Sequence, residues 1–256
     1  MSALPSGTVT FLFTDIEGST QLWEKHPEEM RSALAQHDSI LRDAIASNHG
    51  RLIKTTGDGA HAVFERAMDA VHATLIAQRN LQSLGSSFQS SNLNLEIKAR
   101  MGLYTGEAEV RGHDYYGQAL NRAARIMSVA HGGQVLLSSI TAEVIRERLP
   151  ADTRLKDLGE YHLKDLIRPE HLYQLIAEDL KQDFPDIQSF NVLQNNLPVQ
   201  LTSFIGREKE MAEIKALLHS ARLVTLTGSG GTGKSRLSVE IGRGELPSFM
   251  NGVWLI

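Results

Sequence analysis

The chain has 256 residues, of which 41% are hydrophobic and 22% charged, as is usual for one large or two small globular domains. Its net charge of −4 argues against direct nucleic-acid binding, which would favour a basic chain. Cysteine is absent, so disulfides and thiolate zinc sites are excluded. No basic signal segment opens the sequence, and no apolar run approaches the roughly 20 residues that cross a bilayer. We therefore expect a soluble cytoplasmic protein without a membrane segment.

Strand-like and helix-like segments alternate from Thr8 to about Ala177. In chain order, hydrophobic periodicity and turn residues predict a strand at 8–14, a helix over 20–47, a hairpin over 51–64, a helix over 67–84, a strand–turn–strand unit over 95–110, a helix over 116–130, a strand at 134–138, a helix over 139–149 capped by Ser139 or Thr141, and strands at 153–161 and 171–176. Helices interleaved with hairpins indicate an α/β or α+β domain with a mixed or antiparallel sheet.

The composition changes after Ala177. Residues 178–200 are rich in Asp, Gln, Asn and Pro, which is typical of a linker. An amphipathic helix is predicted over 204–220, then a strand, glycine loop and helix over 222–241, and the last residues look like the start of a further strand. The predicted organisation is a domain at 1–177, a linker at 178–200 and a second domain's beginning at 201–256.

Two carboxylates at strand ends are the first candidate site. Asp58 lies between two glycines in the predicted hairpin, where a plain β-turn is the favoured alternative. Asp15 ends the first predicted strand, where a helix-capping acid is the alternative. If the strands are neighbours, the two carboxylates meet and suit Mg²⁺ or Mn²⁺. The following helix start presents backbone N–H groups that favour a phosphate.

A second candidate group follows the predicted strand–turn–strand unit. Asn121 and Arg125 are four residues apart on a predicted helix, so they share a face that could hold a ribose and a phosphoryl group. The alternative is a solvated helix face. Lys164 is a further candidate residue, and the alternative is an ordinary exposed lysine on a strand. The ten histidines, His61 and His72 among them, are interpreted as ordinary strand or helix residues.

Four segments together resemble the successive blocks of class III nucleotidyl cyclase catalytic domains, most closely those of bacterial adenylate cyclases. They are FLFTDIEGST, IKTTGDGAHAVF, DYYGQALNRAARI and HLKDLIRPEHLYQL, and the resemblance covers about residues 9–176. It implies an α/β (α+β) fold with a ferredoxin-like βαββαβ core and a central mixed or antiparallel sheet. It also implies a head-to-tail homodimer with active sites at the interface.

The resemblance implies a metal and phosphate role for the first blocks. Asp15 and Asp58, with the Ile16 carbonyl, would hold two divalent metal ions, Mg²⁺ or Mn²⁺. The amides near Ser19 and Thr20 would face the terminal phosphates of the nucleotide.

The remaining blocks imply the other substrate contacts. Lys54 and Asp114 match the pair that reads the adenine edge, where guanylate cyclases typically carry a glutamate in place of the lysine. Asn121 would orient the ribose, Arg125 would meet charge on the α-phosphoryl group, and Lys164 would clamp phosphate. Lys54 would serve the opposite active site of the dimer from Asp58.

The implied activity is conversion of ATP to 3′,5′-cyclic AMP and pyrophosphate by two-metal-assisted attack of the ribose 3′-OH on the α-phosphate. Two alternatives stay open. One is a catalytically weak or inactive nucleotide-binding regulatory module, and the other is a guanylate cyclase.

The glycine loop Gly228–Ser235, GSGGTGKS, fits the P-loop pattern, with a predicted strand before it and a predicted helix after it. Gly228 and Gly233 would shape the loop, Lys234 would reach the β- and γ-phosphates, and Ser235 would bind Mg²⁺. A chance glycine-rich loop is the alternative. The region resembles the start of signal-transduction ATPases, and we expect this fragment not to hydrolyse ATP by itself because its supporting sheet would lie beyond Ile256. The chain would then be a truncated product or an excised piece.

Overall fold

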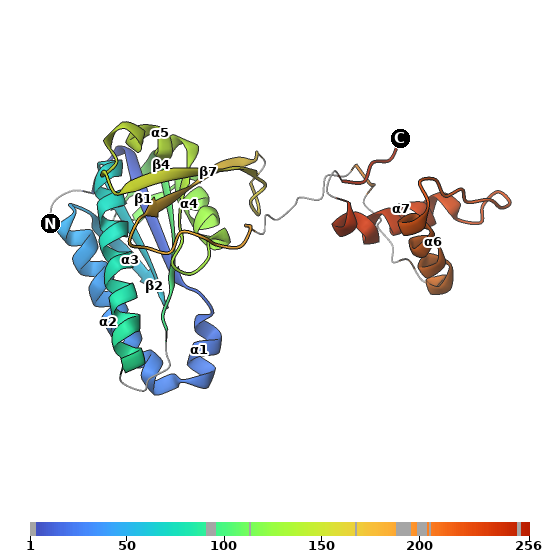
Figure 1. Cartoon of the computed structure of the whole chain (residues 1–256). Coiled ribbons are helices and arrows are strands. Elements are labelled where there is room, and N and C mark those ends of the chain that lie inside the picture. Colours follow the sequence, from blue (N-terminus) through green and yellow to red (C-terminus); the bar gives the residue numbers. More distant parts are fainter. Residues whose placement is uncertain are drawn as a thin grey trace. The chain divides into compact units, whose positions relative to one another are not determined.

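The computed structural model describes residues 4–90 (86–90 as backbone only), 96–112, 114–166, 168–187, 196–198, 204, 206–249 and 252–256. The chain divides into two compact units, 1–189 and 190–256. Figure 1 shows both units and labels many of their helices and strands.

The first unit is built on a mixed eight-stranded sheet. Seven strands lie in the order β2-β3-β1-β4-β6-β8-β7, and β5 pairs with β4 outside this path. Only the β4–β6 pair is parallel among the described strand pairs. The strands are β1 (Gly7–Ile16), β2 (Arg51–Thr56), β3 (Gly59–Phe64), β4 (Ala99–Arg111), β5 (Asp114–Tyr116), β6 (Val135–Ser138), β7 (Thr153–Tyr161) and β8 (Glu170–Ala177). This confirms the predicted α+β fold with a central mixed sheet.

The helices cover the two faces of this sheet (Figure 1). They are α1 (Ser19–Lys25), α2 (Pro27–Ser47), α3 (Ala67–Ser90), α4 (Gln118–Val129) and α5 (Ser139–Ile145), with a short 3-10 turn η1 (Arg146–Arg148). Because side chains alternate along a strand, Leu12 packs in the core beneath α2 and α3, whereas Phe11 and Phe13 pack in the core beneath α4. The candidate residues of β1, β2 and the turn after β2 therefore stand on a sheet with a buried core on each side.

Three local predictions for the first unit are wrong. The helix expected over 20–47 is two helices that meet at His26, because Pro27 cannot donate a backbone hydrogen bond and instead begins α2. The helix α5 is capped by Ser138, whose side chain accepts from the Thr141 amide, and not by Ser139 or Thr141. Ser138 is extended and so can turn its hydroxyl back onto the first turn.

The expected turn within 95–110 is also absent, since β4 continues without a break through Gly106 to Arg111. Ten residues of β4 pair with β1, from Ala99 opposite Ile16 to Ala108 opposite Gly7. This long pairing overrides the local turn preference of the Thr-Gly-Glu sequence. The reversal occurs later, at Gly112, and leads into β5.

The hairpin formed by β4 and β5 folds back over the α4 side of the sheet. The ring of Tyr115 meets Phe11 edge to face with 5.2 Å between ring centroids. Its hydroxyl donates to the carbonyl of Pro5 at 2.6 Å, which satisfies its only polar group inside the core. Tyr115 thus fixes the hairpin that carries Asp114.

Residues 178–187, expected to begin a linker, pack on the first unit. The Gln174 amide donates to the carbonyl of Gln182 at 2.7 Å, and Ile187 is buried with the α4-side core. From α3, Arg79 donates to Asp179 and to Asp152. The stretch after β8 is therefore fastened by hydrogen bonds and ion pairs.

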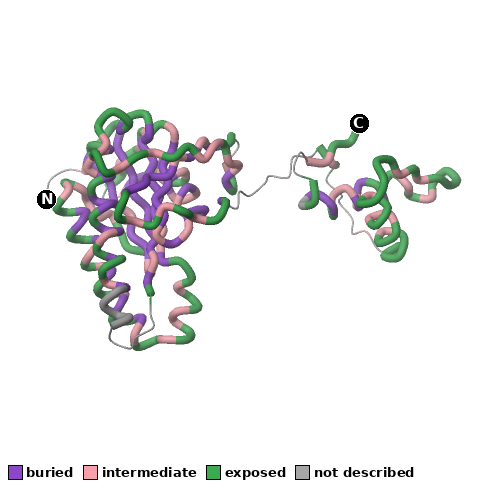
Figure 2. The backbone as a smooth tube through the Cα atoms, in the orientation of Figure 1, coloured by how far each residue is buried: buried purple, intermediate pink, exposed green. Residues whose placement is uncertain are grey.

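The second unit is much less buried (Figure 2). Its helices are α6 (Glu208–Ser220), which buries no residue, and α7 (Lys234–Glu245), which buries Leu237, Val239 and Ile241, followed by the 3-10 turn η2 (Leu246–Ser248). The strand predicted before the glycine loop does not form among the described residues, and Leu223 is 83% exposed. Only Val253 forms an isolated bridge near the end of the described chain. Across the described parts of both units, no helix is long and apolar enough to cross a bilayer.

Candidate functional site

Asp15 lies near the end of β1 on the α4 side of the sheet and is paired with an arginine from the neighbouring strand. Arg100 stands directly opposite it on β4 and donates from Nε to Asp15 Oδ2 at 2.8 Å, with a second contact from Nη2. Arg100 also donates to the carbonyl of Ser128 near the end of α4, at 3.3 Å. Asp15 is thus a charged group held in a defined place, with its charge balanced by Arg100.

Asp58 occupies the two-residue turn between β2 and β3. Gly57 has φ of 64°, which a residue with a side chain rarely adopts and which suits the first central position of a type II′ turn. At Gly59 an added Cβ would lie 2.6 Å from the carbonyl oxygen of Thr14. The two glycines therefore let the turn form and press against β1.

The pairing of β1 with β3 brings the two carboxylates to the same end of the sheet. Thr14 stands opposite Ala60, so two residues further the antiparallel register brings Ile16 level with Asp58. Asp58 Oδ2 is buried and has no hydrogen-bond partner among the described residues. An unpartnered buried carboxylate oxygen at the same end of the sheet as a second carboxylate is an arrangement that a divalent cation can stabilise.

The donor set of this region fits a hard cation. Both side chains offer carboxylate oxygens, and Ile16 adds a backbone carbonyl. No group of three or more His, Cys, Asp or Glu side chains is placed to hold a metal within the described residues. Any cation held here would therefore complete its shell with oxygens from a bound molecule or water, as Mg²⁺ commonly does.

Lys54 and Asp114 are brought together from distant parts of the chain. Lys54 Nζ donates to Asp114 Oδ2 at 3.4 Å, and the two side chains are 46% and 37% exposed. Asp114 Oδ1 accepts from the Tyr115 amide at 2.8 Å, which fixes the carboxylate. The pair thus presents one donor and one acceptor side by side to solvent.

Asn121 and Arg125 share the exposed face of α4, as their spacing predicts, and line one cavity of about 560 Å³. The cavity, called the arginine cavity below, is lined by Gln118, Asn121, Arg122, Arg125, Asp165, Leu166 and Arg168. Three arginines in one hollow favour an anionic ligand.

Two of the arginines in the arginine cavity already have carboxylate partners. Arg125 donates to Asp165 Oδ2 at 2.5 Å, and the partners are 35% and 61% exposed. Arg122 is paired with the buried Glu170 and lies over the ring of Tyr104. Burial raises the pKa of Glu170, and the neighbouring Arg122 charge opposes that effect. Arg122 is thus fixed by structure, whereas Arg125 is held by an exposed contact that an anion can replace.

Ser19, Thr20 and Lys164 occupy exposed or half-exposed positions. Ser19 and Thr20 begin α1 directly after Gly18, which has φ of 68°. Lys164 lies in the turn between β7 and β8, not on a strand, and is next to Asp165 of the arginine cavity. The start of α1 follows Asp15 along the chain. Lys164 precedes Asp165, the ion-pair partner of Arg125.

The predicted residues therefore form three groups in one chain. Asp15, Ile16 and Asp58 lie at one end of the β1–β3 pair, Lys54 contacts Asp114, and Asn121 lines a cavity with Arg125. The described lining of the arginine cavity includes neither Asp15 nor Asp58.

The glycine loop of the second unit leads into a helix as predicted. Helix α7 begins at Lys234 after Gly233, whose φ is 78°. Lys234 Nζ donates to the carbonyls of Gly228 and Ser229, both at 2.9 Å, so it curls back over its own loop. Ser235 follows it in the first turn of α7.

Two residues that pair with members of these groups, Arg100 and Asp165, were not predicted, and the buried His37 was not singled out. Arg100 and Asp165 are found only through strand register and chain reversal, and neither has a pattern in the sequence. His37 is fully buried on α2, with Met30, Ala33 and Leu41 also buried on that helix. Its position on the apolar face was a readable signal, but one that usually indicates a satisfied core histidine.

His61 supports the interpretation of a histidine with a packing role. Its ring stacks on Phe13 with 3.9 Å between ring centroids. Burial lowers its pKa, with a further lowering from Lys54 and an opposing effect of Asp114.

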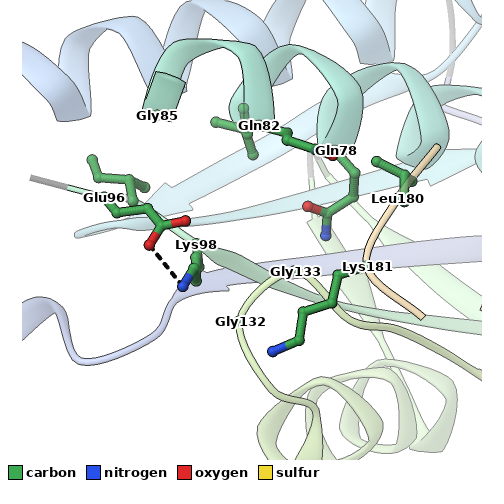
Figure 3. A pocket seen from close by; sticks show the side chains of 11 residues that line it. Gln78, Gln82, Gly85, Glu96, Lys98, Gly132, Gly133, Leu180 and Lys181 are labelled. Carbon is green, nitrogen blue, oxygen red and sulfur yellow. Dashed lines mark ion pairs between the residues drawn. The ribbon is translucent and has the colours of Figure 1, made fainter. Parts of the chain in front are cut away.

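A separate cavity of about 200 Å³ lies between α3, the start of β4 and the loop after α4. Figure 3 shows Lys98 and Lys181 at its rim, with Glu96 paired to Lys98 at 2.8 Å. None of the predicted site residues lines it. Its lysines and glutamate form an exposed surface group that is separate from the predicted site residues.

Comparison with known proteins gives one family. The model described as adenylate and guanylate cyclase catalytic domain matches residues 1–177, which end at the last residue of β8. Over 212 residues the chain is 40% identical to an uncharacterised protein of Mycobacterium tuberculosis, covering 81% of this chain and 70% of that protein.

Two further similarities are more distant. Over 227 residues the chain is 33% identical to an adenylate cyclase of Neurospora crassa, covering 69% of this chain but only 10% of that protein. Among solved structures, an adenylate cyclase from Trypanosoma brucei in its monomeric state superposes with a TM-score of 0.61 at 27% identity, covering 74% of this chain and 97% of that one.

Proposed function

Since the chain belongs to the adenylate and guanylate cyclase catalytic domain family, we propose that it converts ATP to 3′,5′-cyclic AMP and pyrophosphate. The observation that carries the choice of ATP is the Lys54–Asp114 contact at 3.4 Å. At the adenine edge, the ring nitrogen N1 accepts and the exocyclic amine donates. A lysine opposite N1 and an aspartate opposite the amine satisfy both groups. Guanine in the same position would present a donor to the lysine and an acceptor to the aspartate.

Asp15, Asp58 and the Ile16 carbonyl would hold two divalent cations, Mg²⁺ or Mn²⁺. When bound, such ions supply Lewis-acid stabilisation of the attacking 3′-oxygen and of the triphosphate. The buried, unpartnered Asp58 Oδ2 supports this assignment. Arg100 donates to Asp15 at 2.8 Å; with a cation held by Asp15, this guanidinium would be available to the triphosphate.

Arg125 and Asn121 would act on the reacting end of the nucleotide. Arg125 would exchange Asp165 for the α-phosphoryl oxygens, whose negative charge grows during attack by the 3′-oxygen. Asn121 would orient the ribose hydroxyl from the same helix face. Lys164 and the amides of Ser19 and Thr20 would bind the outgoing pyrophosphate.

The active site is proposed to be shared between two copies of the chain in a head-to-tail homodimer. One copy would supply Asp15 and Asp58, and the other Lys54, Asp114, and the arginine cavity. The support is that the described lining of this cavity includes neither metal-binding carboxylate.

A mixing experiment tests this sharing. Asp58→Ala and Arg125→Ala chains, each inactive alone, should regain activity when mixed, because one of the two sites in a mixed dimer is intact. Mixed dimers that form but stay inactive would refute the shared site.

The substrate is tested by measuring cyclic AMP from ATP and cyclic GMP from GTP with Mn²⁺ under the same conditions. We expect production from ATP to exceed that from GTP by at least about 10-fold, since two mismatched polar contacts oppose guanine. Equal rates, or a preference for GTP, would reject the adenine assignment.

A nucleotide-binding regulatory module with feeble turnover is the second candidate. The observation that favours it is that Asp15 and Arg125 are both engaged by ion pairs within the chain, to Arg100 and Asp165. This candidate predicts saturable ATP binding with no cyclic AMP above the background of an Asp58→Ala control.

For the second unit we propose a phosphate-binding role for Gly228–Ser235. Lys234 would exchange the Gly228 and Ser229 carbonyls for β- and γ-phosphate oxygens, and Ser235 would bind Mg²⁺. Protection of the loop from proteolysis by ATP, lost in Lys234→Ala, would support it.

A further inference from the structure

His37 is a buried polar side chain that the proposed chemistry does not use. Its side chain is 0% exposed and it lies on the face of α2 that packs on the sheet. Its ring Nδ1 is 3.1 Å from Asp38 Oδ1, and its Nε2 is buried without a hydrogen-bond partner among the described residues. A buried nitrogen without a hydrogen-bond partner destabilises the folded state, so a structural or functional reason for His37 is expected.

The packing of α2 places His37 close to the turn that carries Asp58. One turn before it, Ala33 packs in a small cluster with Ile16 of β1. The strand register brings Asp58 level with Ile16, so His37 lies about one helical turn from the level of Asp58.

The charges around the ring agree with this position. The carboxylates that act on it electrostatically are Asp38, its neighbour, and then Asp58 and Asp15. Burial lowers the pKa of His37, against the opposing effect of these acids, and so favours the neutral form of the ring.

Hydrogen-bond chemistry then defines what Nε2 can do. A carboxylate can only accept a hydrogen bond. In the neutral ring Nδ1 therefore carries the hydrogen and donates it to Asp38, and Nε2 is an acceptor. Asp58 Oδ2, also buried and without a partner, is a second acceptor. A water molecule that donates one hydrogen to each would satisfy both atoms.

We propose that His37 is a positioning residue for the metal-binding carboxylate of Asp58, acting through its Nε2 and a shared hydrogen-bond donor. This inference rests on the proposed function, because it assumes that Asp58 binds a divalent cation. Groups behind a metal-binding carboxylate fix its orientation, and their loss typically weakens metal binding by about 10–100-fold.

Two matched variants separate this role from a purely structural one. His37→Asn keeps a polar atom at the position of Nδ1 and so keeps the Asp38 contact, but it has nothing at the position of Nε2. His37→Gln places an amide oxygen near the position of Nε2 and loses the Asp38 contact. The proposal predicts that Mn²⁺ affinity follows the atom at Nε2, whatever happens to stability.

The measurement is Mn²⁺ binding by the full chain, monitored through the electron paramagnetic resonance signal of free Mn²⁺. The samples contain an ATP analogue with a methylene group between the α- and β-phosphorus atoms. We expect about 10-fold weaker binding or more in His37→Asn and less than about 3-fold change in His37→Gln. Thermal unfolding without metal reports the stability of each variant. If His37→Asn does not fold, His37→Leu, which fills the core without either nitrogen, should show the same loss of Mn²⁺ affinity.

Asp58→Ala separates the two possible failures. If it binds Mn²⁺ like the wild type, the metal assignment of the proposed function is wrong. If it loses Mn²⁺ while His37→Asn and His37→Leu keep wild-type affinity, the inference about His37 alone is overturned. Equal losses in His37→Asn and His37→Gln would also overturn it, because they would indicate a packing role.

Discussion

The two units of the chain carry one phosphate-related motif each, in very different surroundings. In the first, Asp58 lies in a turn pressed against β1, with buried core on both faces of the sheet. In the second, Lys234 begins a helix, but the preceding segment forms no strand among the described residues and α6 buries nothing. A sequence motif defines the residues of a site, whereas a packed sheet is what holds them in place.

The strongest test of this contrast compares one residue from each unit. Asp58→Ala should lower cyclic AMP production by at least about 100-fold, because it removes a proposed metal ligand. Lys234→Ala should leave it within about 2-fold. Cyclic AMP would be measured at saturating ATP and Mn²⁺, with circular dichroism as a check on folding. A comparable loss from Lys234→Ala would mean that the second unit takes part in catalysis.

The second-largest expected effect depends on the planar geometry of the Arg125 side chain as well as on its charge. Arg125→Lys keeps the charge but loses the planar fork, so kcat should fall by about 30-fold or more while KM for ATP changes little. Arg146→Lys, an exposed arginine paired with Glu143, is the matched control. A rise in KM at unchanged kcat would instead assign Arg125 to ground-state binding of the triphosphate.

A smaller effect is expected at the base-reading pair. In Lys54→Glu, a carboxylate faces both Asp114 and the acceptor N1 of adenine, so kcat/KM for ATP relative to GTP should fall by about 10-fold or more. Lys156→Glu, an exposed lysine of β7, should change neither value. An unchanged ratio in Lys54→Glu would contradict the proposed reading of adenine.

The smallest effect concerns the stretch that follows β8. Arg79→Ala removes the contacts to Asp152 and Asp179 at 2.6 and 2.7 Å and should destabilise the first unit by about 0.5–1 kcal/mol, since these groups are partly exposed. The Arg79 hydrogen bond lowers the pKa of Asp179, so this stabilisation exists above the ordinary aspartate pKa and is lost as pH falls through the lowered value.

Thermal unfolding at pH 7 and below about pH 4 would measure the effect of Arg79→Ala. The difference from wild type should shrink at the lower pH, where Asp179 takes up its proton. Arg31→Ala, which removes an exposed pair to Glu28 within α2, is the control. An equal loss at both pH values would indicate that Arg79 acts through packing.

The sequence was informative where the signal is local. Alternating hydrophobic residues predict the strands, and the two glycines around Asp58 predict the tight turn. Pro27 carried a readable signal for the break between α1 and α2. Non-local contacts were harder: the ten-residue pairing of β4 with β1 cancels the turn preference near Gly106.

Non-local contacts also explain why some residues near the candidate site were not predicted. Arg100 meets Asp15 through strand register, and Asp165 meets Arg125 across a chain reversal 40 residues away. His37 is one polar residue on an apolar helix face. The contacts of Arg100 and Asp165 leave no pattern along the chain because the fold creates them, whereas the position of His37 is readable but usually indicates a core histidine.

The β4–β5 hairpin has a consequence for how base preference can change. In the sheet, Lys54 is opposite His61 of β3, which is level with Phe13 of β1 and Gly102 of β4. Asp114, the ion-pair partner of Lys54, is instead opposite Arg111, nine residues further along β4. If β4 were straight, Gly102 and Arg111 would be roughly 30 Å apart. The 3.4 Å contact between Lys54 and Asp114 therefore requires the β4–β5 hairpin to bend back over the sheet. One residue of the proposed base-reading pair therefore stands on a hairpin that Tyr115 holds against the core. Under the proposed function, substitutions that change the bend of this hairpin would alter the preference between ATP and GTP without touching Asp15 or Asp58.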